Sequence, residues 1–143
     1  MRSTGPVPGP DRAAVDDAVR RLRELGTFPG ASEADLRGIV SAGRIVTVPS
    51  GWSLIWDKTP ADKAYVILAG SVEVRRGTEV VATLHAGDVI GELAILHRKL
   101  RSASVTAASA LTVLHFEREA VERLYDEVPA VREALDATAA ERS

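Results

Sequence analysis

Arg101 is the residue whose position in this sequence most clearly requires a specific chemical partner. In an extended segment alternate residues share a face, so Arg101 shares its face with Ala103 and Val105, while Ser102 and Ser104 take the other face. An arginine on an apolar face is costly to bury alone, because its guanidinium does not lose its proton. The parallel N–H groups of a guanidinium match a phosphate well. The spacing therefore predicts an anionic partner for Arg101.

Gly91 and Glu92, which precede this segment, supply two further groups. Residues 92–96 are helix formers that follow a glycine, which predicts a single helical turn inside a strand-rich region. The first N–H groups of such a turn point outward and attract anions, and Gly91 allows a ligand to approach the backbone closely. Glu92 is either the internal ion-pair partner of Arg101 or an acceptor for a sugar hydroxyl, and the residues alone leave both alternatives open.

The elements that position these residues are indicated by hydrophobic periodicity. Apolar residues recur at helical spacing over residues 12–25, and Ser32 with Asp35 resembles a capping box that opens a second helix ending at Gly43. Two more helical segments follow Phe116, with Pro129 between them. Short β-branched segments bounded by turn residues predict eight strands: Ile45–Val48, Trp52–Trp56, Lys63–Leu68, Ser71–Arg76, Glu79–Leu84, Asp88–Ile90, Arg101–Ala107 and Leu111–Phe116.

This order predicts a mainly β fold with flanking helices, in which the eight antiparallel strands form a β-roll or jelly roll, also called a double-stranded β-helix. We expect a flexible arm over residues 1–11, which contain three prolines, and a single domain over residues 12–143. The predicted parts of this domain are N-terminal helices over residues 12–43, a β-roll over residues 44–116 and C-terminal helices over residues 117–143.

Composition excludes several classes of protein. The 143 residues are 45% hydrophobic and 27% charged, as in one ordinary soluble domain. The sequence has no apolar segment long enough to span a bilayer and no N-terminal secretion signal, so we expect a cytoplasmic protein without membrane association. The absence of cysteine removes disulfides and zinc–thiolate sites. A net charge of −2 predicts no general affinity for nucleic acid.

Other residues that could do chemistry have simpler explanations. His85, His97 and His115 lie on different segments and form no His-x-His pair, so we expect no metal site. Trp52 and Trp56 share the period of a strand, which favours packing in the core or on a sheet face over a platform for base stacking. Neither a serine–histidine–acid set nor a carboxylate pair is evident, so we expect no enzymatic activity.

Several motifs together resemble one known family. Gly91–Ala94 (GELA) and Arg101–Val105 (RSASV) are similar to the two halves of the phosphate-binding cassette of cyclic-nucleotide-binding domains, which would here span residues 91–105. Residues 48–55 and 65–74 and the Ala86-Gly87-Asp88 turn are also similar to that family, as is the order of helices, roll and helices. The Ser-Ala pair after the arginine resembles the sensor domain of the bacterial catabolite activator and its relatives.

The resemblance implies a ligand and roles for the cassette residues. Arg101 would hold the cyclic phosphate and Glu92 the ribose 2′-hydroxyl, with backbone amides around Leu93, Ala94, Ser102 and Ala103 completing the cradle. It implies cyclic AMP or cyclic GMP as the ligand, with cyclic AMP favoured, and no cofactor. The full set of expected ligand-binding residues is Ile90, Gly91, Glu92, Leu93, Ala94, Arg101, Ser102 and Ala103.

Two departures from the family shape the rest of the prediction. The family commonly has an aromatic residue where Ile90 stands, a glycine near Arg98 and a proline where Leu100 stands, and this altered loop favours a second hypothesis, a ligand-independent interaction domain of the same fold. Related transcription factors continue into a dimer helix and a helix-turn-helix, but only residues 130–143 follow Pro129 here. We therefore expect no direct DNA binding, and a partner protein that carries the output. The last apolar stripe could fold back on the roll or pair in a homodimer.

Overall fold

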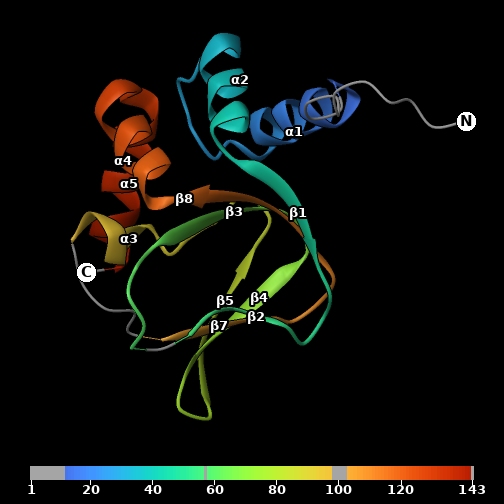
Figure 1. The fold of residues 1–143 in the computed structure, drawn as a ribbon, viewed down its shortest axis with the longest axis vertical. Coiled ribbons are helices and arrows are strands. Elements are labelled where there is room, and N and C mark those ends of the chain that lie inside the picture. Colours follow the sequence, from blue (N-terminus) through green and yellow to red (C-terminus); the bar gives the residue numbers. More distant parts are fainter. Residues whose placement is uncertain (1–11, 57, 98–102, 143) are drawn as a thin grey trace, which may run out of the picture.

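Two four-stranded antiparallel sheets face one another, and the helices cluster on the side of one of them (Figure 1). The computed structural model describes residues 12–56, 58–97 and 103–142. The elements in this part of the chain are α1 (Arg12–Leu25), α2 (Glu33–Ala42), β1 (Arg44–Val48), β2 (Ser53–Ile55), β3 (Lys63–Ala69), β4 (Ser71–Arg76), β5 (Glu79–His85), β6 (Val89–Ile90), α3 (Glu92–Leu96), β7 (Ser104–Ala107), β8 (Leu111–Glu117), α4 (Arg118–Glu127) and α5 (Pro129–Arg142).

The strand order is that of a roll. The first sheet has the order β1-β8-β3-β6 and the second sheet the order β2-β7-β4-β5, with antiparallel pairing throughout. Consecutive strands lie in different sheets at every step except β4–β5, which pair with one another in the second sheet. The predicted fold class, a mainly β protein with an eight-stranded roll and flanking helices, is therefore confirmed.

The first sheet is buried on both of its faces. In β3, Val66 packs with the helices while Ile67 packs against the second sheet, and in β8 the same division separates Leu114 from Val113. Two hydrophobic cores therefore share these strands as a common wall, one core between the sheets and the other between the first sheet and the helices.

The turn from β3 to β4 requires a glycine. Gly70 has a φ of +94°, in the left-handed region that side chains rarely adopt, and a Cβ at this position would lie 2.4 Å from the carbonyl oxygen of Ala110. Gly77, in the β4–β5 hairpin, also has a positive φ of +64°, but a Cβ there would meet nothing within 4 Å. Both turns need the conformational freedom of glycine, and only the first also needs its small size.

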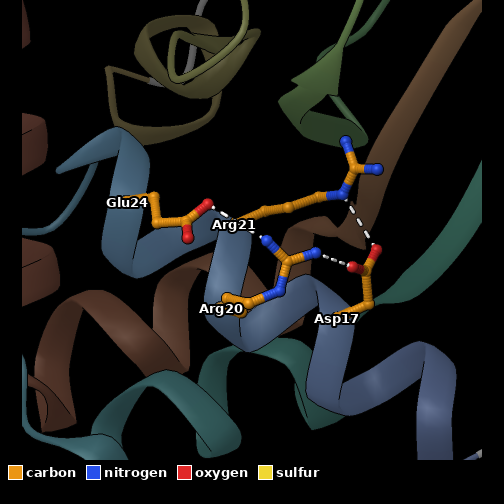
Figure 2. A network of polar contacts seen from close by, with 4 residues as sticks. All are labelled: Asp17, Arg20, Arg21 and Glu24. Atoms are coloured by element: carbon orange, nitrogen blue, oxygen red, sulfur yellow. Dashed lines mark hydrogen bonds and ion pairs between the residues drawn. The ribbon is translucent and has the colours of Figure 1, made fainter.

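The N-terminal helices carry a network of exposed ion pairs. Figure 2 shows Asp17 of α1 accepting from both Arg20 and Arg21, with Arg20 also reaching Glu24. The hydrogen bonds from Arg21 and Arg20 lower the pKa of Asp17 below its ordinary value. Exposed pairs of this kind contribute little to stability. The packing of Val19 and Leu22 of α1 against the roll is the larger contribution to the anchoring of this helix.

The predicted caps and boundaries of the helices are largely correct. The Ser32 hydroxyl accepts from the Asp35 amide at 3.0 Å, and the Asp35 carboxylate accepts from the Ser32 amide at 3.1 Å, which completes the capping box. Pro129 begins α5, where Val131 and Leu135 are buried in the core beneath the helices. The last apolar stripe therefore folds back on the roll. In residues 12–56, 58–97 and 103–142, every helix is too short or too polar to cross a membrane.

Candidate functional site

The cassette begins where β6 ends. Ile90 is 2% exposed, packs in the core between the sheets and pairs with Tyr65 of β3. Gly91 follows with a φ of +87°, and this conformation turns the chain from the strand into α3. A side chain at position 91 would strain this turn, so the turn requires glycine as well as permitting close approach to the backbone.

Helix α3 places a carboxylate inside the protein. The predicted helical turn is present, and Glu92, its first residue, is only 1% exposed. A buried carboxylate is stable only when hydrogen-bonded, and in the described part of the chain every buried side-chain nitrogen or oxygen atom has such a partner. Both sequence-based alternatives for Glu92, an internal ion pair and a ligand contact, agree with this burial.

Helix α3 packs against the C-terminal helices. Ile95 is buried and Ala94 half-buried in the core that includes α4 and α5, and α3 contacts both of these helices. A cavity of about 30 Å³ at this junction is lined by Glu92 together with residues of the first sheet, of α2 and the loop before it, and of α4 and α5. This cavity has room for no more than a few water molecules, so a nucleotide could not occupy it.

The second half of the cassette leads into β7. Ala103 is half-buried, and Val105 and Ala107 point into the core between the sheets, whereas Ser104 and Thr106 lie on the other face. The predicted alternation is therefore correct in the part of the strand that the structure describes. Arg101 and Ser102 lie outside the described residues, so their placement on the apolar face and in the cradle stays a prediction.

The first sheet also contains a buried histidine, His115 of β8. His115 is 8% exposed, and its ring meets that of Tyr65 edge-on at a centroid distance of 5.3 Å. Arg44 of β1 donates to His115 Nδ1 at 3.4 Å, so the proton of the neutral ring is on Nε2, which lies 3.5 Å from the Glu117 carboxylate. Burial, followed by the charges of Arg44 and Lys63, lowers the pKa of His115 below 6.5, against the opposing effect of Glu117.

Sequence reasoning considered His115 only as a metal ligand. No group of three or more histidines, cysteines or acids that could hold a metal is found among residues 12–56, 58–97 and 103–142. His85, at the end of β5, and His97, directly after α3, are both exposed. The sequence pattern placed His115 in a strand. Its contacts with Tyr65 and Arg44, however, depend on the register of β8 against β3 and β1, which a local pattern does not reveal.

The prediction that both tryptophans are packed is wrong. Trp52 is 64% exposed and Trp56 is 63% exposed. Strand β2, Ser53–Ile55, is shorter than predicted and lies at an edge of the second sheet, so both tryptophans fall just beyond its ends. Period-two spacing gave them a shared face, but it could not show that the strand stops before each of them.

Comparisons with known proteins agree with this geometry. The sequence profile of the family described as "Cyclic nucleotide-binding domain" matches residues 45–128. A cAMP-dependent protein kinase regulatory subunit of Yarrowia lipolytica is 36% identical over 105 residues, which are 72% of this chain and 26% of that protein. The CRP-like cAMP-activated global transcriptional regulator of Mycobacterium tuberculosis (strain H37Rv) is 25% identical over 119 residues, which are 80% of this chain and 53% of that protein.

Solved structures give the same fold. The regulatory domain of Toxoplasma gondii PKA with cAMP superposes with a TM-score of 0.71 and 25% identity, covering 82% of this chain and 46% of that one. PKAR CBD2 bound to Sp-2Cl-cAMPS gives a TM-score of 0.72 at 19% identity, covering 92% of this chain and 95% of that one, which supports the fold alone. The chain thus spans about a quarter to a half of the length of these two curated relatives. The cassette turn, the two-sheet roll and these matches together show that the chain belongs to the cyclic nucleotide-binding domain family.

Proposed function

We propose that this chain senses a cyclic mononucleotide, cyclic AMP in preference to cyclic GMP, and reports it to a partner protein through α4 and α5. The observation that carries the proposal is α3, which begins with the buried Glu92 after the Gly91 turn and packs on both C-terminal helices. The family is regulatory rather than catalytic, and we propose the same for this chain, in the cytoplasm.

The proposed ligand contacts divide between the two halves of the cassette. Glu92 accepts a hydrogen bond from the ribose 2′-hydroxyl, and Arg101 holds the cyclic phosphate with two parallel N–H groups. Amides around Leu93, Ala94, Ser102 and Ala103 complete the cradle, beside the side chain of Ile90. The inward phase of β7 supports this arrangement, because Val105 and Ala107 bring the second half of the cassette to the interior of the roll.

Coupling to the helices follows from the packing of α3. Ile95 contacts the same core as Val121 of α4 and Leu135 of α5. A ligand that moves α3 must therefore move or loosen these helices, and the ligand favours whichever arrangement binds it better. The relatives named above include a kinase regulatory subunit and a transcriptional regulator, and both names connect cAMP with the control of another process.

Calorimetric titration of the purified chain with cyclic AMP and cyclic GMP tests the proposal. We expect a saturable heat of binding with at least one nucleotide, and a higher affinity for cyclic AMP than for cyclic GMP. Arg101→Ala should abolish this heat of binding. The matched control is Arg76→Ala, which removes an exposed arginine at the β4–β5 hairpin and should leave the affinity unchanged. The absence of heat with both nucleotides from the folded wild-type chain would rule the proposal out.

A second candidate is a ligand-independent interaction domain. It is favoured by the segment His97-Arg98-Lys99-Leu100, which lacks the glycine and proline common in the family cassette. This candidate predicts no nucleotide binding and unchanged partner binding in Arg101→Ala. Saturable binding of either nucleotide in the titration above contradicts it.

A further inference from the structure

Four directly paired residues form a row across the first sheet that ends at the cassette. His115 of β8 pairs with Arg44 of β1 on one side and with Tyr65 of β3 on the other. Tyr65 in turn pairs with Ile90 of β6, the residue before Gly91. Directly opposite residues of antiparallel strands share a face and bring their side chains into contact. The row therefore connects the β1 edge of the sheet with the start of the cassette.

This row faces the interior of the roll. Tyr65 and Ile90 belong to the core between the sheets, and His115 is in phase with Val113 of the same core. The Tyr65 hydroxyl donates to the carbonyl oxygen of Leu54 at 3.4 Å, so the Tyr65 side chain reaches from the first sheet to β2 of the second. The position of the Tyr65 ring thus depends on contacts with both sheets.

The start of the cassette depends on Tyr65 because β6 is short. Strand β6 consists of Val89 and Ile90, lies at the end of the strand order and, in the part of the chain that the structure describes, pairs with β3 alone. Within this pairing Tyr65 is the direct neighbour of Ile90. A shift of the Tyr65 side chain therefore acts on Ile90 and on the Gly91 turn that follows it.

The contacts of His115 change when its ring gains a proton. The neutral ring accepts from Arg44 at Nδ1, but in the protonated ring both nitrogens are donors, so the N–H groups of Arg44 then face another N–H. At Nε2 the ring lies 3.5 Å from the carboxylate of Glu117, whose side chain is 63% exposed at the end of β8. Protonation thus breaks the contact with Arg44, attracts the ring toward the exposed Glu117, and disturbs its edge-on contact with Tyr65.

From these observations we propose that His115 is a positioning residue for the cassette. While its ring is neutral, it holds Tyr65 and the Ile90–Gly91 turn in the arrangement that binds the nucleotide, and the affinity falls when the ring gains a proton. The inference rests on the proposed function and adds pH as a second input to the same site.

The surroundings of the ring give the direction of the effect. The charged and titratable groups that face it are Arg44 from β1, Lys63 and Tyr65 from β3 and Glu117 from β8. Burial and the two cations lower the pKa of His115, against the opposing effect of Glu117. The nucleotide affinity should therefore be full above about pH 6.5 and should fall as the pH decreases below that value.

Calorimetric titration with cyclic AMP at pH 7.5 and pH 5.5 tests the proposal. We expect the wild-type affinity to be at least about fivefold lower at pH 5.5, the lower end of typical couplings between two sites. His115→Gln and His115→Phe have no group to protonate at this position and should bind equally at both pH values. The matched controls are His97→Gln and His85→Gln, which remove exposed histidines and should retain the wild-type decline. His97 is the stricter control, because it directly follows α3.

A second measurement uses the wild-type chain and so does not depend on the folding of a variant. The chain has three histidines, and nuclear magnetic resonance can follow the titration of each ring, with the signal of His115 assigned by its absence in His115→Gln. By linkage, a nucleotide that binds the neutral form better must lower the pKa of His115 further. We expect saturating cyclic AMP to produce this shift for His115 and to leave the pKa of His85 unchanged.

The outcomes separate this inference from the proposed function. Equal wild-type affinity at the two pH values, a decline that persists in both His115 variants, or the same pKa of His115 with and without nucleotide overturns the positioning role and leaves the sensor proposal standing. Failure of the wild-type chain to bind any nucleotide at pH 7.5 overturns both. Circular dichroism at pH 5.5 identifies a loss of affinity that is caused by unfolding.

Discussion

The two sheets of the roll differ in how much of each one is buried. In the first sheet, β3 and β8 are buried over most of their length on both faces, because helices cover the outer side (Figure 1). In the second sheet, β5 is exposed along nearly its whole length and carries Val80 and Val81 in contact with solvent. The difference shows that stability is concentrated in the wall shared by the two cores, while the second sheet mainly completes the roll around the interior.

Truncation of a side chain in each sheet gives the largest test of this comparison. Leu114→Ala removes a fully buried side chain of β8 and should lower the free energy of unfolding by about 2–5 kcal/mol. Val81→Ala at the exposed β5 edge should change it by less than about 0.5 kcal/mol. Urea denaturation monitored by circular dichroism measures both values. Equal losses in the two variants would contradict the assigned role of the first sheet.

Two glycine turns provide a test of intermediate size. Gly70→Ala combines a positive φ with a collision against the Ala110 carbonyl, so we expect a loss of about 3 kcal/mol. Gly77→Ala, within the second sheet, has the positive φ without the collision and should cost about 1 kcal/mol. The difference between their urea midpoints measures the cost of the collision with Ala110 at the β3–β4 turn. A larger loss of stability in Gly77→Ala would contradict this explanation.

The pH dependence of stability should depend on His115 in the first sheet. Its lowered pKa means that the folded protein binds this proton less readily than the unfolded chain, so the contribution is complete above about pH 6.5 and is lost as the pH falls below that value. The groups that face the ring are Arg44 from β1, Lys63 and Tyr65 from β3 and Glu117 from β8.

The measurement is urea denaturation at pH 7.5, 6.5 and 5.5. His115→Gln should flatten the decline between the upper and lower values, whereas His85→Gln, at an exposed position in the second sheet, should leave it as in the wild-type chain. An unchanged slope in His115→Gln would show that other groups control acid stability.

The smallest expected effect is at Lys58, beside the end of β2. A non-glycine residue at a φ of +64° is strained by about 1–2 kcal/mol, and glycine recovers this at an entropic cost of about 0.5–1 kcal/mol. Lys58→Gly should therefore raise stability by about 0.5 kcal/mol. Lys58→Ala, which keeps the strain, should give no increase, and thermal melts of the two variants distinguish them.

Local patterns were enough for most of the fold. The capping box at Ser32, the β4–β5 hairpin at Gly77 and the helical turn after Gly91 all follow from interactions between residues a few positions apart, and each is present in the structure. The fold class follows from them, because eight short strands with tight turns have few arrangements that bury their apolar faces.

What could not be predicted depends on contacts across the sheets. The exposure of Trp56 is decided by the position of β2 at an edge, and the burial of His115 by the register of β8 between β1 and β3. Neither the edge position of β2 nor the register of β8 can be read from the periodicity of nearby residues. At the cassette, the Gly91 turn and the inward phase of Val105 were predicted correctly, and the role of Arg101 stays a prediction.

The five residues of α3 are too few to form a stable helix alone, because nucleation costs more than so short a segment recovers. Its order is therefore supplied by α4, α5 and β3, on which it packs. Under the proposed sensor function, information passes in both directions. A partner that holds α4 and α5 would change the affinity for the nucleotide by the same factor by which the nucleotide changes the affinity for the partner. The nucleotide affinity of the isolated chain would then describe one end of a range that such a partner sets.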